Sequence, residues 1–156
     1  MTKRMLAALL ALVGLFVAVY LTLYKIGVIG ELVCAAGSCE TVQTSRWAIF
    51  LGAPVAAWGV GYYVVVLVMA TAGTMERWED SSALSTAMLV VTAWGALFSL
   101  WLTSLELFVI HAICQWCVGS ATIAVALFVV SLLDWRETRL LDRDEPAAPA
   151  PASPAA

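Results

Sequence analysis

The chain has 156 residues, of which 63% are hydrophobic and only 12% charged, and its formal net charge is −3. A soluble domain carries about 25% charged residues, so this composition excludes an ordinary soluble globular domain and indicates an integral membrane protein. The few basic residues do not gather into a patch, which argues against a nucleic-acid-binding protein.

Four apolar runs are long enough to cross about 30 Å of hydrocarbon at about 1.5 Å per helical residue. They cover about residues 5–24, 54–72, 84–110 and 113–133. We therefore expect an all-α fold, an integral membrane four-helix bundle that forms one domain over residues 1–135. The polar and Pro/Ala-rich end at 136–156 is expected to be a disordered tail on the cytoplasmic side.

The first run follows a basic start at Lys3 and Arg4 and therefore resembles a signal peptide. However, a secretory core has only about 7–15 apolar residues, and no clean small-x-small cleavage site closes this run. We expect a retained signal anchor that serves as the first span.

Basic residues near the ends of the runs predict how the bundle is oriented, because cytoplasmic loops carry more Lys and Arg. With the N-terminus in the cytoplasm, the outer side holds only Lys25 and Arg46. The inner side then holds Lys3, Arg4, Arg77, Arg136, Arg139 and Arg143. This asymmetry predicts that both termini are cytoplasmic and that the loop at 25–53 lies outside.

Between Ser85 and Leu133 the only acidic or basic side chains are Glu106 and His111. The third and fourth runs are nearly continuous, so a tight turn is predicted near His111, which otherwise could be a proton donor or a metal ligand. An intramembrane carboxylate costs about 2.5–3.5 kcal/mol on insertion scales and is a functional candidate. Glu106 is therefore either an interfacial acid or a proton donor that lines a binding pocket.

The four cysteines all fall on the predicted outer side. Cys34 and Cys39 lie in the first outer loop, and Cys114 and Cys117 lie at the outer start of the fourth run. An oxidising outer compartment permits disulfides. Residues three apart share one helix face, and a helix N-terminus lowers the pKa of a thiol. The pattern favours thiol–disulfide exchange, with Cys117 deeper in the membrane than Cys114.

Other interpretations of the cysteines remain open at this point. They could be small buried core residues, structural disulfides, or, together with His111, ligands of a zinc-like site. A heavy-metal uptake protein of the mercuric-ion type would also hold paired cysteines, but at least one pair should then face the cytoplasm.

Four motifs together resemble the bacterial members of the vitamin K epoxide reductase family, over residues 5–135. They are "CAAGSC" at 34–39, "TSRW" at 44–47, "LGAPVAAWG" at 51–59 and "LELFVIHAICQWC" at 105–117. The other bacterial family of quinone-linked thiol oxidases, the disulfide bond protein B type, has its C-x-x-C pair in the first outer loop. The order of the pairs is reversed here.

The resemblance implies a quinone-dependent thiol oxidoreductase of the bacterial inner membrane. Cys34 would exchange with a separate thioredoxin-like periplasmic protein, and Cys39 would pass electrons to Cys114 through an inter-segment disulfide. Cys117 would face a membrane quinone, either ubiquinone or menaquinone, and hand electrons to it.

The resemblance also implies a quinone pocket capped by a short amphipathic helix near "TSRW". The expected pocket residues are Ser45, Trp47, Trp58, Tyr62, Leu102 and Glu106. The animal enzymes use an asparagine and a tyrosine for epoxide chemistry, and those places are taken here by Val55 or Ala56 and by Ala121. The resemblance therefore implies plain quinone reduction rather than epoxide reduction.

Overall fold

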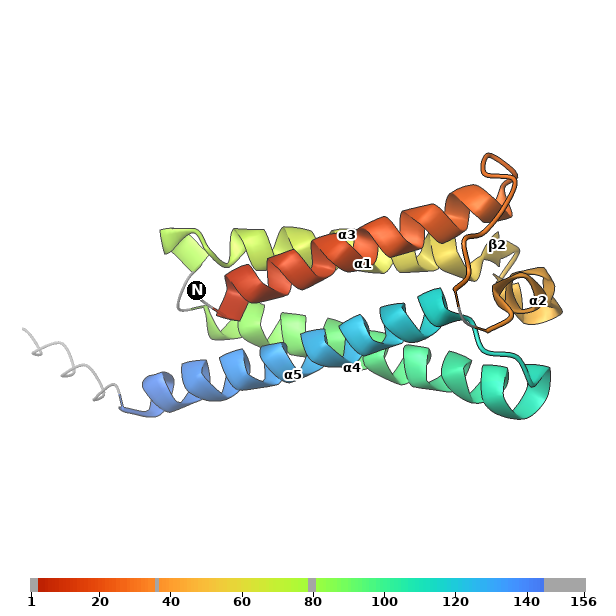
Figure 1. The fold of residues 1–156 in the computed structure, drawn as a ribbon. Coiled ribbons are helices and arrows are strands. Elements are labelled where there is room, and N and C mark those ends of the chain that lie inside the picture. The colour runs from red at the N-terminus through yellow and green to blue at the C-terminus, as the bar shows by residue number, and fades with distance from the viewer. Residues whose placement is uncertain (1–2, 36, 79–80, 145–156) are drawn as a thin grey trace, which may run out of the picture.

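Four long helices form the body of the molecule, in a computed structural model that describes residues 3–35, 37–78 and 81–144. They are α1 (Lys3–Lys25), α3 (Val55–Ala72), α4 (Ser82–Leu105) and α5 (Gln115–Asp144). The four run up and down in one elongated bundle, with α1 beside α3 and α4 beside α5 (Figure 1). Each is long and apolar enough to cross a membrane, which confirms the expected all-α membrane bundle.

The short elements that build the site gather at one end of the bundle, at the right of Figure 1. They are α2 (Cys39–Thr44), a 3-10 turn at Arg46–Ala48, and the strands β1 (Ile49–Phe50) and β2 (Ala53–Pro54). The short amphipathic helix expected near "TSRW" is not continuous: α2 ends at Thr44, the first residue of the motif, and Arg46–Ala48 form a 3-10 turn. At the opposite end, a second 3-10 turn (Glu76–Trp78) connects α3 to α4.

The β1–β2 hairpin is a local departure from the all-α expectation. Ile49 pairs with Pro54, and Phe50 pairs with Ala53. Leu51 and Gly52 both have positive φ, 52° and 80°, the conformation that a tight two-residue hairpin requires.

Small residues let α1 approach its neighbours closely. Ala7, Ala11, Gly14 and Ala18 are buried along one stripe of α1, and a Cβ at Gly14 would lie 2.2 Å from a ring carbon of Tyr63. Close packing of this kind drives helix association where lipid removes the hydrophobic effect between helices. Large apolar side chains point outwards instead, as expected for a surface that contacts lipid.

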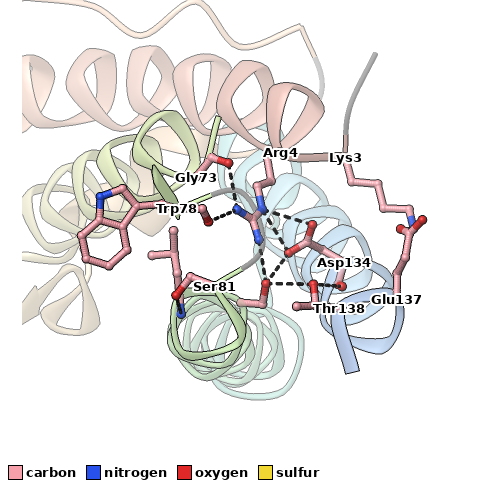
Figure 2. Close-up of polar contacts among 10 residues, drawn as sticks. Lys3, Arg4, Gly73, Trp78, Ser81, Asp134, Glu137 and Thr138 are labelled. Carbon is pink, nitrogen blue, oxygen red and sulfur yellow. Dashed lines mark hydrogen bonds and ion pairs between the residues drawn. The ribbon is translucent and has the colours of Figure 1, made fainter. Parts of the chain in front are cut away.

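A buried arginine, Arg4, connects several segments at the end of the bundle opposite the cysteines, and Figure 2 shows its polar contacts. The Arg4 guanidinium donates to the carbonyl oxygens of Gly73 and Trp78, both at 2.8 Å, and to Ser85 Oγ at 2.9 Å. It also pairs with the Asp134 carboxylate at 3.3 Å. Arg4 is only 6% exposed. One side chain from α1 therefore contacts the α3–α4 connection, α4 and α5 together.

The turn between the last two spans lies where the sequence predicts it. A π-helical turn (Glu106–Ile110) extends α4 and ends at His111, which has left-handed backbone with φ 55°. The Ala112 amide donates to the Glu106 carbonyl at 3.2 Å, which closes the turn. His111 is exposed and marks the point at which the chain reverses.

The last helix is longer than the fourth apolar run. α5 continues to Asp144, so the first part of the expected tail, 136–144, is helical. The sequence from Arg136 to Asp144 contains no Gly or Pro, and the first proline is Pro146. Helix-forming residues therefore prolong the helix until a proline is near. The Pro/Ala-rich stretch at 145–156 lies outside the described residues.

Candidate redox site

Backbone pairing holds the loop between α1 and α2 against the start of α5. Gly37 and Cys114 form an antiparallel bridge, and the Ser38 amide donates to the Ile113 carbonyl at 2.9 Å. Gly37 has φ 89°, and a Cβ there would lie 2.2 Å from the Ile113 oxygen. Only glycine fits this approach without strain, so the "AAG" of the first motif permits the two cysteine segments to meet.

The two residues between Cys114 and Cys117, which are Gln115 and Trp116, also bind this loop. Gln115 Oε1 accepts from the Ala35 amide at 3.1 Å, and Trp116 Nε1 donates to the Val33 carbonyl at 2.9 Å. The Tyr20 ring packs on the Trp116 ring with centroids 5.2 Å apart, and its hydroxyl accepts from the Val33 amide at 3.1 Å. The inner positions of the C-x-x-C motif therefore fix the loop.

These contacts bring all four cysteines to one place. Cys34 and Cys39 form a disulfide with a Cα–Cα distance of 6.2 Å, while Cys114 and Cys117 are free thiols. Cys39 and Cys114 are buried in one cluster, and Cys34 and Cys117 pack against it. An oxidised pair therefore lies beside a reduced pair, which is the arrangement that thiol–disulfide exchange requires.

Cys114 lies just before the fourth span, at the start of α5. A hydrogen bond from the Cys117 thiol lowers the pKa of the Cys114 thiol to about 7, against the opposing effect of burial. Backbone amides of Cys117 and Trp116 favour the thiolate further, and the Glu106 charge disfavours it. At neutral pH a large fraction of Cys114 is therefore the nucleophilic thiolate.

The alkylation rate of reduced Cys114 should follow this lowered pKa. We expect the rate to rise with pH and to level off above about 7, because the thiolate reacts and the thiol does not. Peptide mass spectrometry after pulses of iodoacetamide measures it. Cys117→Ala removes the hydrogen-bond donor and should move the midpoint up towards about 8.5. A wild-type midpoint already at that value would contradict the assignment.

A cavity of about 780 Å³ opens beside Cys117, between α3 and α4 and next to α2. Its wall is mostly apolar and aromatic, and it includes all six of the expected pocket residues, Ser45, Trp47, Trp58, Tyr62, Leu102 and Glu106. Val55, Ala56 and Ala121 also line it. The sequence therefore identified side chains that the fold brings to one cavity, although their binding role stays a prediction.

Individual pocket residues differ in what they offer a ligand. Trp58 Nε1 donates to the Phe50 carbonyl at 3.1 Å, and Ser45 Oγ donates to the Val42 carbonyl at 2.7 Å, so both groups support local structure. Tyr62 differs: its hydroxyl is buried and has no hydrogen-bond partner among the described residues. A ligand with a carbonyl oxygen would satisfy that hydroxyl.

Sequence reasoning missed some of the cavity wall. Trp94, Phe98 and Trp101 line it from α4, and their spacing of four and three residues on one helix face was a usable signal. Gln43 was missed as well. Its side-chain amide lies 3.7 Å from Cys117 Sγ, but a single glutamine in the short helix α2 gives no pattern that sequence alone could distinguish.

Glu106 is buried, with 4% of its surface exposed. Its Oε2 accepts from the Cys114 amide at 3.0 Å, and its carboxyl group shares the cavity wall with Cys117, with whose thiol it interacts. His111 points away at the exposed turn. Among the described residues, no three His, Cys, Asp or Glu side chains are grouped as metal ligands would be.

The model of the vitamin K epoxide reductase family matches residues 5–132. The matched segment includes both cysteine pairs, the cavity residues and most of all four long helices.

Proposed function

Because the chain belongs to the vitamin K epoxide reductase family, and is accordingly a membrane oxidoreductase with a redox cysteine pair, we propose that it links an extracytoplasmic dithiol to a membrane quinone. Its electron donor is a separate thioredoxin-like protein. The gathering of four cysteines in one cluster, with Cys117 on the wall of an aromatic cavity, is the observation that carries the proposal.

The proposed electron path follows the burial of the four sulfurs. Cys34 is half-buried and therefore open to a protein partner, whereas Cys39 and Cys114 are buried next to each other. Cys117 lines the cavity. Electrons would pass from the partner to Cys34 and Cys39, then to Cys114 and Cys117, through successive thiol–disulfide exchanges.

The cavity suits a quinone, either ubiquinone or menaquinone. Aromatic and aliphatic walls fit the ring, and the Tyr62 hydroxyl offers an unused donor for a quinone oxygen. When bound there, a quinone would supply a two-electron acceptor beside Cys117. Val55, Ala56 and Ala121 leave the wall apolar where the animal enzymes carry polar groups, which favours plain quinone reduction over epoxide reduction.

The proposed orientation places the cysteine end outside the cytoplasm. That end of the bundle carries Lys25 and Arg46, and the opposite end carries the start of α1, the α3–α4 connection and the end of α5 (Figure 1). Six of eight basic residues belong to the opposite end, as the positive-inside rule requires of a cytoplasmic side. The site would then face the periplasmic side of the bacterial inner membrane.

Cys34→Ala separates the partner step from the rest of the path. We expect the variant to lose quinone-dependent oxidation of a reduced thioredoxin-like protein but to keep oxidation of a small dithiol. A small dithiol can reach the inner pair without Cys34, whereas a folded partner cannot. Quinone absorbance in detergent-solubilised protein measures both reactions. Equal loss with both donors would contradict the proposed order of the sulfurs.

A heavy-metal carrier remains the competing function, and labelling distinguishes it. All four cysteines lie at one end of the bundle, whereas a carrier needs thiols that face each side in turn. An impermeant thiol reagent should label reduced cysteines only from the periplasmic side. Labelling from the cytoplasm would favour transport.

A further inference from the structure

Glu106 is the most deeply buried carboxyl group among the residues that the structure describes, with 4% of its surface exposed. No Lys or Arg in that part of the chain forms an ion pair with it. A buried carboxylate without a counter-ion is unfavourable, so its neutral form is accessible and it can exchange a proton with a neighbour. The groups around Glu106 determine where that proton can go.

The ionisable groups around Glu106 are few. The Cys114 and Cys117 thiols face it from the start of α5, and Tyr62 of α3 lines the same cavity. From α2 the nearest polar side chain is Gln43, which contacts Cys117 but has no proton to give at neutral pH. His111 is exposed at the turn. Cys117 shares the cavity wall with Glu106 and interacts with its carboxyl group, so it is the neighbour best placed to take the proton.

We propose that Glu106 is the acid–base partner of Cys117: it gives one proton to the Cys117 sulfur when a Cys114–Cys117 disulfide opens, and takes it back when that disulfide closes. The inference rests on the proposed function, because the inner pair must turn over. Glu106 is then a catalytic residue, since its carboxyl group touches a reacting sulfur.

The opening step balances in atoms and electrons. The Cys39 thiolate attacks Cys114 Sγ, so the Cys39–Cys114 bond forms and the Cys114–Cys117 bond breaks. The electron pair of the broken bond goes to Cys117 Sγ, which takes the proton from Glu106. The Cys34 thiolate then displaces Cys114, which leaves the Cys34–Cys39 disulfide, a Cys114 thiolate, a Cys117 thiol and a Glu106 carboxylate.

The structure contains the sulfur arrangement that this step produces. Cys34 and Cys39 are bonded, and Cys114 and Cys117 are free. The Cys117 thiol interacts with both the Cys114 sulfur and the Glu106 carboxyl group, and it shares the cavity wall with Glu106. The Cys114 amide fixes one carboxyl oxygen at 3.0 Å, so the acid is oriented towards the pair. In the closing direction the Cys117 proton returns to Glu106, and a bound quinone would take the two electrons of the pair together with two protons from water to become a quinol.

Glu106→Gln tests the proposal through the pH dependence of the reduction potential. The amide oxygen can still accept from the Cys114 amide, but the side chain carries no exchangeable acid. Opening the disulfide then draws one more proton from water than in the wild type. The equilibrium constant for reduction of the variant should fall about tenfold more per pH unit, which is about 30 mV for a two-electron couple.

The measurement uses quinone-free protein equilibrated in a dithiol–disulfide buffer, with the inner pair quantified by peptide mass spectrometry. Glu76→Gln is the matched control, because it removes the same charge at an exposed position at the far end of the bundle. It should keep the wild-type slope. Parallel slopes for wild type and Glu106→Gln would overturn the proposal.

A second measurement needs no substitution and covers the case in which Glu106→Gln does not fold. Infrared difference spectra of wild-type protein with isotope-labelled glutamate should show a carboxylic acid band in the oxidised form that disappears on reduction. Absence of that band would overturn the proposal. Since quinone is not present, a band without quinone reductase activity would remove the proposed function and leave the proton exchange standing.

Discussion

Cys117→Ala should abolish quinone-dependent oxidation of any dithiol, protein or small molecule. Cys117 is the cysteine that lines the cavity, and without its sulfur the inner pair cannot close a disulfide or release two electrons. Removing one member of a catalytic group that acts as a unit costs several orders of magnitude in rate. We expect turnover to fall at least about a thousandfold on that basis, measured by quinone absorbance with a saturating small dithiol.

The control for this variant is Val118→Ala, one residue further along α5. Val118 is 38% exposed and does not line the cavity, so its truncation should leave turnover within about twofold, as for surface changes that cost less than about 0.5 kcal/mol. Cys114→Ala should match Cys117→Ala, because each removes half of one disulfide. If either cysteine variant kept full activity, the proposed relay would be incorrect.

Arg4→Met should produce the largest loss of stability of any single substitution at the end of the bundle opposite the cysteines. It leaves the Asp134 carboxylate, 14% exposed at its side chain, without its cation. Breaking a buried ion pair by removing one partner costs about 3–5 kcal/mol. The carbonyls of Gly73 and Trp78 lose their donor at the same time, which adds to the cost.

Thermal unfolding in a fixed detergent measures the effect, with Lys3→Met as the matched control. Lys3 is the neighbouring basic residue and pairs with Glu137, but both side chains are exposed, at 39% and 61%. Surface pairs contribute about 0–1 kcal/mol, so this control should unfold close to the wild type. Adding Asp134→Leu to Arg4→Met should recover part of the loss, since no buried charge is then unpaired. Equal effects of Arg4→Met and Lys3→Met would show that the buried network is not important for stability.

Hydropathy and spacing predicted the parts of this fold that depend on single stretches of sequence. The four spans follow from runs of apolar residues, and the turn at His111 follows from the one strongly polar point between two such runs. From the order of the spans, the sequence predicted only that the two cysteine pairs lie on the same side of the membrane. The register that joins them, Gly37 against Cys114, depends on tertiary contacts that no local pattern records.

Other features escaped sequence reasoning for identifiable physical reasons. Arg4 was counted only as a basic flank, because its burial depends on acceptors from three other segments. The hairpin at 49–54 has strands of two residues, too short for any periodic signal. Residues 136–144 were expected to be disordered because they are polar. They are helical because helix propensity, and not apolarity, decides where α5 ends.

The pairing of Gly37 with Cys114 also has a kinetic consequence. The loop that carries Cys34 and Cys39 is held against Cys114, so the two pairs react within one molecule. Such tethering can correspond to an effective concentration of about 10⁵ M or more when the geometry is right. Transfer between the two cysteine pairs is then a first-order event that does not depend on how much partner is present. At low partner concentration, the bimolecular reaction of the partner with Cys34 should therefore limit the overall rate. Each electron pair that reaches Cys34 and Cys39 should then pass on to the inner pair faster than it returns to the partner.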